Sequence, residues 1–392
     1  MSVDDLPMLF DEHHLGWADV VRSAVAEVEA IERGNDDHSA SARAVVAALG
    51  RRGLLDLFAP KADSSFDLRA ICLAREGLAW ASGNADSLYA VQGLGTFPIR
   101  SFGSEAQQDA RLAALREGRS VGAFALTEPE AGTDAGSVQT IARRVDDGWI
   151  LDGDKIFISN APIADHFVVF ARLAGEHASK RPPTAAFLVD RPREGLDIVG
   201  PTPLVADHVI GSVSLRGCKV ARDALLGREG EGFSIAMATL DMFRVSVGAA
   251  AVGMARRALD EAVARAAHRH QFGKPIGEFQ QIQAYLADSL AELDAARLLV
   301  YRAACLRDRG AASITREAAV AKMYATEAAQ RIIDRAVQIH GGLGVQRGTV
   351  VERLYREIRP LRIYEGTTEI QRVIIGKGLV HDAIARQPTR ER

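Results

Sequence analysis

Residues 137–159 read SVQTIARRVDDGWILDGDKIFIS and decide the fold class of this chain. The stretch is rich in β-branched and aromatic residues and has a period of two, which is typical of strands. Asp147-Gly148 lies between two such runs and favours a hairpin with a type I′ turn, whose two central residues both need positive φ. Further short runs of the same kind occupy residues 120–126, 166–172, 184–190 and 212–220.

Apolar residues on both sides of this zone follow a helical period instead. Trp17, Val21 and Val25 recur at the spacing of an amphipathic helix. Similar patterns predict helices at 42–49, 70–80 and 86–102, and longer helices follow Phe233, as in a bundle. The order predicts an α+β multi-domain protein with a helical N-terminal domain (1–119), a central antiparallel β-barrel or sandwich domain (120–228) and a C-terminal helical bundle (229–392).

Composition excludes several classes of protein. Hydrophobic residues make up 47% and charged residues 25% of the 392, which is typical of globular chains and not of disordered or fibrous ones. The net charge of −3 indicates no nucleic-acid or membrane partner. Three separated cysteines without a C-x-x-C pair, and the lack of a secretory signal pattern, predict a cytoplasmic protein. The apolar stretch 245–255 is too short to span a bilayer.

Two neighbouring segments of the strand zone could bind a ligand. Residues 126–137, LTEPEAGTDAGS, combine glycines and hydroxyls that can present N–H and O–H donors to an anion, although an ordinary polar turn has the same composition. Phe157 and Ser159 lie two apart near the end of the next predicted strand, so they share a face. This pair suits a flat heterocycle, and a half-buried strand end explains it equally well.

Two segments of the C-terminal zone end helices. Arg269 in a last helical turn complements the helix dipole. His268 and His270 diverge on a helix, so we expect no metal site there. Residues 338–344, QIHGGLG, hold more glycine than a helix end needs, and this would let a ligand approach the backbone closely.

The segment 362–371, RIYEGTTEIQ, offers a carboxylate beside a helix start. Thr367 or Thr368 can cap the following helix, and Glu365 falls just outside it. Partial burial beside Ile363 would raise the pKa of Glu365 towards that of a general base, whereas the helix N-terminus would lower it. The sequence leaves both readings open.

Together these segments resemble the acyl-CoA dehydrogenase family, which implies helical, β and helical domains. The resemblance covers nearly the whole chain, and its motifs are ALTEPEAGTDA, GDKIFISN, RHQFGKPIGEFQ, QIHGGLG and IYEGTTEIQ. It implies an FAD cofactor, whose ring and diphosphate would be held by Phe124, Leu126, Thr127, Gly132 and Thr133. In addition, Phe157 would cover one face of the isoalloxazine, and Ser159 would approach its N5.

The resemblance also implies how the adenine end, the substrate and the base are placed. The adenine end would be bound, typically across a subunit interface, by Arg269, Phe272, Gln280, Gln338 and Gly342, and the cofactor site would be completed by Thr367 and Glu369. The pantetheine channel would be lined by Asp241 and Arg244, with Thr133 and Gly366 near the thioester. Glu365 falls on the family's catalytic base.

The implied reaction removes the α-proton of an acyl-CoA with Glu365 while a β-hydride goes to flavin N5, giving a trans-2-enoyl-CoA. An electron-transferring flavoprotein would receive the electrons, and a homotetramer is expected. Some members carry the base at the position of Phe243, which cannot act as one and which favours a short or unusual acyl group. Phe157 replaces a frequent tryptophan, and Glu130 and Thr133 replace glycine and serine.

Three alternatives remain open at this level. The same scaffold could serve a flavin-dependent oxidase or hydroxylase, although such relatives often lack the glutamate. The acyl group could be carried by an acyl carrier protein instead of coenzyme A. A helical interaction protein without flavin is a third reading, and the hydroxyls and glycines in all five segments argue against it.

Overall fold

The computed structural model describes residues 3, 6–33, 38–60, 65–175 and 182–385. The chain divides into two units. We call residues 16–67 and 84–243 the sheet unit, and residues 1–15, 68–83 and 244–392 the bundle unit.

Most helices of the sheet unit occupy positions that the helical period predicts. They are α1 (Glu12–Arg33), whose first turn belongs to the bundle unit, α2 (His38–Arg51), α4 (Gly83–Phe102) and α5 (Glu105–Arg116). Of these, α1, α2 and α4 were predicted, and α5 was not. Gly53, just after α2, has φ +74°, a conformation that glycine adopts without strain. Ser104 caps α5, since it accepts from Gln107 N while the Gln107 side chain accepts from Ser104 N.

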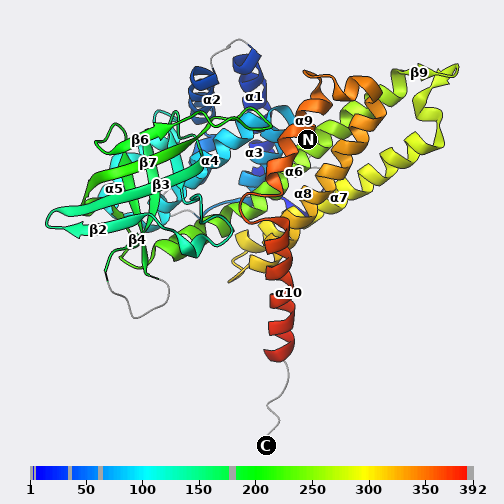
Figure 1. The fold of residues 1–392 in the computed structure, drawn as a ribbon. Coiled ribbons are helices and arrows are strands. Elements are labelled where there is room, and N and C mark those ends of the chain that lie inside the picture. Colours follow the sequence, from blue (N-terminus) through cyan, green and yellow to red (C-terminus); the bar gives the residue numbers. More distant parts are fainter. Residues whose placement is uncertain (1–2, 4–5, 34–37, 61–64, 176–181, 386–392) are drawn as a thin grey trace, which may run out of the picture. The chain divides into compact units, whose positions relative to one another are not determined.

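The strands of the sheet unit form one mixed sheet among the described residues (Figure 1). They are β1 (Gly122–Ala125), β2 (Ile141–Val145), β3 (Gly148–Ser159), β4 (His166–Leu173), β5 (Thr184–Asp190), β6 (Leu196–Val199), β7 (Ile210–Ala221) and β8 (Leu225–Leu226). Their order is β6-β7-β3-β2-β4-β5-β8, with β1 beside β4. The predicted antiparallel pairing holds except that β4 runs parallel to both β1 and β2. The short strands β6 and β8 were not predicted.

The hairpin between β2 and β3 is present, but the predicted type I′ turn is wrong. Val145 pairs with Gly148, so the loop is Asp146-Asp147, and neither residue has positive φ. Gly148 instead lies where a Cβ would come within 2.1 Å of Val220 O on β7. The glycine therefore permits close approach of two strands and does not shape the turn.

Both faces of β4 are buried, which explains its nearly continuous apolar sequence. Phe167 and Val169 belong to one core with residues of β3, β5 and β7. On the other face Val168 and Phe170 belong to a core that includes Ile99 of α4. The sheet is thus anchored on the helices of its own unit.

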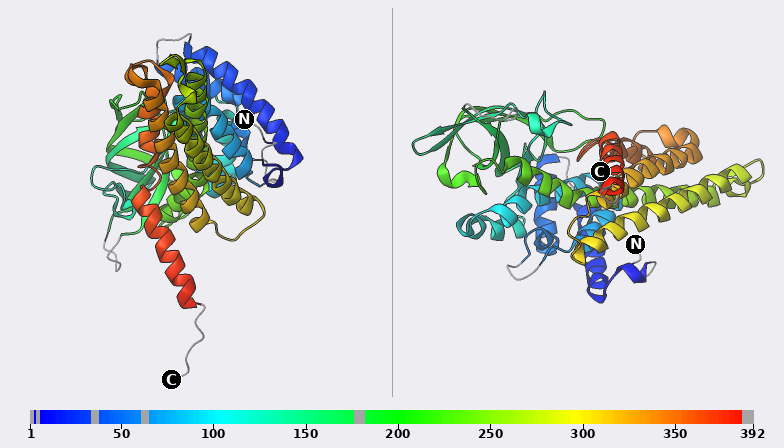
Figure 2. Two further views of the ribbon diagram at one scale, coloured as in Figure 1. Left: turned by 90° about the vertical axis from the view of Figure 1, so that its right-hand side faces the viewer. Right: turned by 90° about the horizontal axis from the view of Figure 1, so that it is seen from below.

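The bundle unit contains the remaining helices (Figure 2). They are α3 (Leu68–Ala81), most of α6 (Gly232–His268), α7 (Gln280–Asp308), α8 (Thr315–His340), α9 (Val350–Leu361) and α10 (Thr368–Ala385). The buried carboxylate of Glu76 on α3 accepts from Tyr301 Oη at 2.6 Å and from Arg297 Nε at 3.1 Å, both on α7. A Cβ on Gly253 of α6 would lie 2.1 Å from Glu76 O, so glycine is required where α6 crosses α3.

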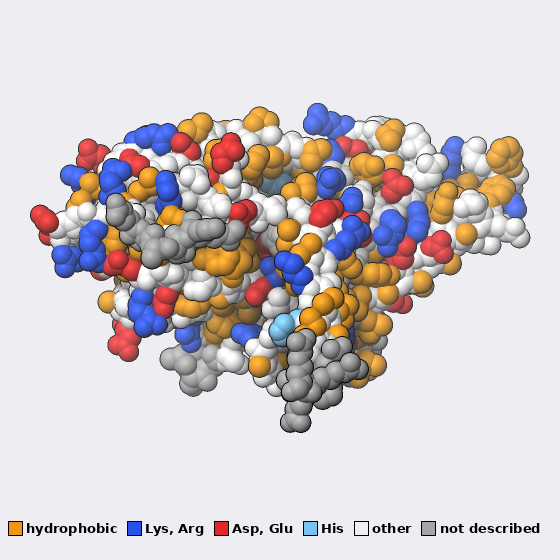
Figure 3. Space-filling view, turned by 60° about the horizontal axis from the view of Figure 1, so that its bottom comes forward, with side chains coloured by type: hydrophobic (Ala, Val, Ile, Leu, Met, Phe, Trp, Pro, Cys, Tyr) orange, Lys and Arg blue, Asp and Glu red, His pale blue; other side chains and the backbone are white. Residues whose placement is uncertain are grey.

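Two helices of this unit stand out by their apolar residues. An 18-residue window of α6 is apolar and long enough to cross a membrane, but 78% of it is buried inside the protein, as in a core helix. On α10 the exposed side chains of Val373, Leu379, Val380 and Ile384 gather where the helix projects from α8 (Figures 1 and 3). This projecting face is an apolar surface of the chain.

Stability should depend on the buried imidazole of His166, the first residue of β4. Burial, with the charge of Arg111, lowers its pKa to about 4 from 6.5. Between these pH values the unfolded chain binds a proton that the folded chain rejects, so the unfolding free energy should fall by about 1.4 kcal/mol per pH unit as the pH drops. His166→Asn should flatten this dependence in urea unfolding at pH 7 and pH 5. The exposed His268→Asn variant is the control, and equal slopes in both variants would contradict the assignment.

Candidate functional site

In the sheet unit the structure brings two of the predicted segments side by side. Ile156 N in β3 donates to Thr127 O at 3.0 Å, and Lys155 Nζ donates to Leu126 O at 3.2 Å. The loop that begins at Leu126 therefore runs along the strand that carries Phe157. Both segments were predicted as candidate ligand sites, but their contact with each other was not predicted.

A buried ion pair fixes this junction. Lys155 Nζ lies 2.7 Å from Glu128 Oε1, and the two side chains are 0% and 2% exposed. The ammonium also donates to Phe170 O at 2.6 Å, while Glu128 accepts from Thr140 N at 2.9 Å. Burial lowers the pKa of Lys155 to about 8, and the attraction of Glu128 opposes that shift. Such a pair positions the loop, because removing one partner would leave the other charged and buried.

The ion pair of Lys155 and Glu128 was not predicted, although the sequence carries a signal for it. Lys155 follows Trp149, Leu151 and Gly153 at a spacing of two and so falls on the buried face of β3. A lysine on such a face needs a buried anion.

Phe157 lies in a β-bulge of β3. Lys155 pairs with Val213 and Ile158 with Gly211, so two residues of β3 oppose one of β7. Phe157 has φ +54° and is 55% exposed. A bulge re-aims a side chain, and here it leaves an aromatic ring at the surface, next but one to the half-buried Ser159.

The rest of the loop is open. Glu128 and Ala131 bond to each other through their backbones, and the exposed Gly132 and Thr133 follow this tight turn. A Cβ on Gly132 would meet no atom within 4 Å. Phe124 is half-buried with its ring 4.8 Å from that of Phe170. An exposed hydroxyl and an unobstructed glycine backbone suit contact with a phosphate group.

In the bundle unit Glu365 and Gly366 form a left-handed turn with φ of +52° and +90°. Glu365 O accepts from Gln371 Nε2 at 3.3 Å and from Arg244 Nε at 3.4 Å. Gly366 O accepts from Lys322 Nζ at 2.8 Å and from Gln371 Nε2 at 2.9 Å. Three helices thus hold the backbone of this turn, and the Glu365 side chain is half-buried.

The prediction of a helix cap after Glu365 is confirmed. Thr367 Oγ1 accepts from Ile370 N at 3.4 Å at the start of α10. Thr368 N donates to Arg362 O at 3.1 Å and closes the loop. Glu369 is exposed, and hydrogen bonds from its own amide and from Thr367 lower its pKa.

Arg244 and Asp241, the predicted substrate residues, both lie on α6. Arg244 is 5% exposed and Asp241 is half-buried. The contact of Arg244 with Glu365 O was not predicted, and neither were the contacts of Lys322 and Gln371. Lys322 had a signal, since it is four residues from Ala318 and four from Thr326 on the buried stripe of α8.

The residues predicted for the adenine end lie at helix ends. Arg269 and Gln280 flank a small hairpin of β9 (His270–Gln271) and β10 (Lys274–Pro275), which lies at the tip of the bundle unit (Figure 1). Phe272 and Gly273 at its turn have φ of +51° and +81°, the positive pair that a type I′ turn needs.

The side chains at these helix ends face outwards. Phe272 is 93% exposed, and Arg269, Gln280 and Gln338 are exposed as well. Gly342 follows α8 and has open space at its Cβ position. Residues that share this exposure can contact a ligand or another subunit.

Positive φ at non-glycine residues occurs in both units, mainly at residues that were predicted to be functional. Among the described residues only Phe157, Asn160, Phe272 and Glu365 are non-glycine residues with positive φ. Three of the four were singled out from sequence. A bulky residue in this region costs free energy and persists where the surroundings demand it, most often at functional sites.

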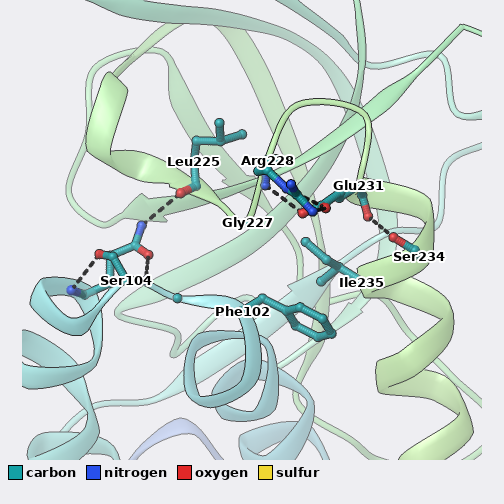
Figure 4. A pocket seen from close by; sticks show the side chains of 10 residues that line it. Phe102, Ser104, Leu225, Gly227, Arg228, Glu231, Ser234 and Ile235 are labelled. Carbon is teal, nitrogen blue, oxygen red and sulfur yellow. Dashed lines mark hydrogen bonds and ion pairs between the residues drawn. The ribbon is translucent and has the colours of Figure 1, made fainter.

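A separate hollow of about 490 Å³ in the sheet unit includes none of the predicted residues (Figure 4). Its polar groups bind one another: Gln107 Nε2 donates to Leu225 O at 3.0 Å, Arg228 pairs with Glu231, and Ser234 Oγ donates to Glu231 O at 2.8 Å. With these groups satisfied, the hollow offers little to a polar ligand.

Comparison with known proteins shows the family. The chain matches the descriptions "Acyl-CoA dehydrogenase, N-terminal domain" over residues 11–119, "middle domain" over 123–215 and "C-terminal domain" over 230–380. It therefore belongs to the acyl-CoA dehydrogenase family, whose members are FAD-dependent oxidoreductases. The resemblance found from the motifs is confirmed.

Particular relatives are similar over most of their length. A short-chain specific acyl-CoA dehydrogenase of Megasphaera elsdenii is 41% identical over 81% of this chain and 83% of that protein. A 3-(aryl)acrylate reductase of Clostridium sporogenes is 38% identical over 95% of this chain and all of that protein.

Solved structures confirm the predicted fold of helical N- and C-terminal parts with a central sheet. Butyryl-CoA dehydrogenase of Megasphaera elsdenii aligns with a TM-score of 0.86 and 34% identity, covering 95% of this chain and 99% of that one. A chain of a structure titled "Electron transferring flavoprotein of Acidaminococcus fermentans" aligns with a TM-score of 0.88 and 34% identity over the same shares.

Phe157 allows flavin contact and folding stability to be separated. Phe157→Gly should remove the exposed ring and relieve a positive-φ strain of about 1–3 kcal/mol, so the protein should be at least as stable as the wild type. It should nevertheless lose flavin, measured as the ratio of flavin to protein absorbance after gel filtration. Phe157→Trp keeps an aromatic face and should retain flavin. Equal retention by both variants would remove Phe157 from the cofactor site.

Proposed function

We propose that this enzyme oxidises a short acyl-CoA to the trans-2-enoyl-CoA, with Glu365 as the base that removes the α-proton. The observation that carries the proposal is the left-handed Glu365-Gly366 turn, which α6, α8 and α10 hold through four hydrogen bonds. These hydrogen bonds fix the backbone of the turn, so the Glu365 carboxylate is attached to a rigid part of the protein, as a general base requires. Family membership supports the same reading.

The residues present fit the FAD cofactor. An exposed aromatic ring at Phe157, open space over Gly132 and Gly342, and the exposed Thr133 hydroxyl match a molecule with one flat ring system and a diphosphate. We propose that the ring and diphosphate are held by Phe124, Leu126, Thr127, Gly132, Thr133, Phe157 and Ser159. We likewise propose that the rest of the FAD molecule, including its adenine end, is held by Arg269, Phe272, Gln280, Gln338, Gly342, Thr367 and Glu369. Bound FAD supplies the two-electron acceptor of the reaction.

The polypeptide supplies the proton transfer. Glu365 must be ionised to accept the α-proton of the thioester, and it must stay fixed while negative charge develops on the thioester oxygen. Arg244 and Lys322, which hold its loop, bring two positive charges to the same region. Both charges favour the carboxylate form of Glu365 and a negatively charged transition state. We assign Asp241, Arg244, Thr133 and Gly366 to contact with the thioester and its pantetheine arm.

Packing around Phe243 supports a short acyl group. This side chain is 1% exposed, and its ring lies 5.6 Å from that of Phe58 and 6.1 Å from that of Phe97. A Cβ on Gly93 would come within 2.5 Å of it. The Phe243 ring thus lies among other aromatic side chains, which favours a short acyl group, and the relative from Megasphaera elsdenii is named short-chain specific.

An electron-transferring flavoprotein is the proposed electron acceptor, and a cytoplasmic homotetramer is the proposed assembly. The structural neighbour titled after such a flavoprotein supports the first proposal. The exposed apolar side chains of α10 support the second, because a further copy of the chain would cover them.

The substrate is identified by anaerobic bleaching of the oxidised flavin with a panel of acyl-CoAs. We expect butyryl-CoA to bleach the flavin and palmitoyl-CoA to do so at least tenfold more slowly. 3-Phenylpropanoyl-CoA tests the second candidate, an arylacrylate reductase run in reverse, which the relative from Clostridium sporogenes supports. If no acyl-CoA bleaches the flavin and oxygen is consumed with another substrate, the oxidase alternative replaces the proposal.

Glu365→Gln tests the base. The variant should keep its flavin but bleach about 10²–10⁴-fold more slowly with the best acyl-CoA, because an amide cannot accept the proton. The exposed Glu194→Gln is the matched control and should bleach at the rate of the wild type. Normal bleaching by Glu365→Gln would mean that another group is the base.

A further inference from the structure

A buried lysine of α8 carries out no proton-transfer step, but it contacts the turn that carries the proposed base. Lys322 is 0% exposed, although lysine is among the residues least often buried. Ala318, Ala325 and Thr326 share its buried face of the helix. Burial of an ammonium group costs free energy unless oxygen atoms and an anion compensate it, so the groups around Lys322 should indicate its role.

The oxygen atom that Lys322 binds belongs to the turn of the base. Its Nζ lies 2.8 Å from Gly366 O, which also accepts from Gln371 Nε2 at 2.9 Å. The neighbouring carbonyl of Glu365 is bound by Gln371 and by Arg244. Lys322 thus donates to the carbonyl of the residue that follows Glu365. The φ of +52° at Glu365 is unfavourable unless neighbouring contacts hold the backbone in place.

The charges that act on Lys322 come from α6, α8, α10 and the turn of the base. Glu365 attracts the ammonium most strongly, Arg244 on α6 repels it, and Glu327 on α8 and Glu369 on α10 attract it. Glu327 is itself paired with Arg362 at 2.9 Å. Burial lowers the pKa of Lys322 to about 8, and the attraction of these carboxylates opposes that shift. Since the attraction is mutual, the ammonium stabilises the ionised form of Glu365.

We propose that Lys322 is a positioning residue for Glu365: its hydrogen bond to Gly366 O holds the left-handed turn, and its positive charge favours the carboxylate form of Glu365. The assignment of a charge effect on turnover rests on the proposed function of Glu365. The effect on the turn does not rest on that function, because it concerns the backbone of the protein without substrate.

The charge effect is tested by the pH profile of anaerobic flavin reduction with butyryl-CoA. Lys322→Met should move the acid limb of kcat/KM to higher pH by at least half a unit, because Glu365 then ionises less readily. Lys322→Arg keeps the charge and should restore the limb of the wild type. The exposed Lys377→Met of α10 is the matched control. An acid limb that stays in place in Lys322→Met would overturn this part of the proposal.

The effect on the turn is tested by hydrogen exchange in the purified holoenzyme without substrate. The amide of Thr368, which donates to Arg362 O across the loop, should exchange at least tenfold faster in Lys322→Met than in Lys377→Met. Unchanged exchange would overturn the positioning role. Should Lys322→Met not fold, Lys322→Gln, which is neutral but polar, takes its place with the same expected shift of the limb.

The two measurements separate this inference from the proposed function. If the wild type is reduced by no acyl-CoA, the proposed function fails, and the exchange rate still decides whether Lys322 holds the turn. If the wild type is reduced but neither the acid limb nor the exchange rate responds to Lys322→Met, only the inference fails.

Discussion

Left-handed backbone at bulky residues is the constraint on which the candidate site depends. Each such residue costs about 1–3 kcal/mol and persists only where neighbouring contacts leave no alternative. For Phe157 these contacts are the bulge against β7 and the buried pair of Lys155 and Glu128. For Glu365 they are the donors on α6, α8 and α10. Folding of the helices and the sheet thus supplies the free energy that fixes the site.

Buried cations have the same task in both units. Lys155 holds Leu126 O at the start of one loop, and Lys322 holds Gly366 O beside the other. An ammonium group suits this role because its three donors can bind carbonyl oxygens in several directions, and a nearby carboxylate balances its charge. The partners are Glu128 for the first lysine and the Glu365 region for the second. Neither lysine needs to touch a ligand to shape the site.

Much of the fold could be predicted from periodicity, because the spacing of apolar residues shows which face of a helix or strand is buried. Most of the helices and six of the strands were found in this way, whereas α5 and α9 were not, and Thr367 was among the predicted caps. The parallel pairing of β4 with β1 and β2 escaped prediction, since strand order depends on contacts between distant segments. The type I′ turn was predicted at Asp147-Gly148 and occurs instead at Phe272-Gly273, because the glycine at 148 serves close packing against β7.

The sequence by itself determined the order of helices and strands, the family and the motifs of the site. These are local properties, set by side-chain period, turn chemistry and short stretches of residues. Only the tertiary structure decided which oxygen atoms Lys155, Lys322, Arg244 and Gln371 bind and which residues take positive φ. Such contacts join residues far apart in the chain, and their free energy depends on burial that arises only when the elements pack.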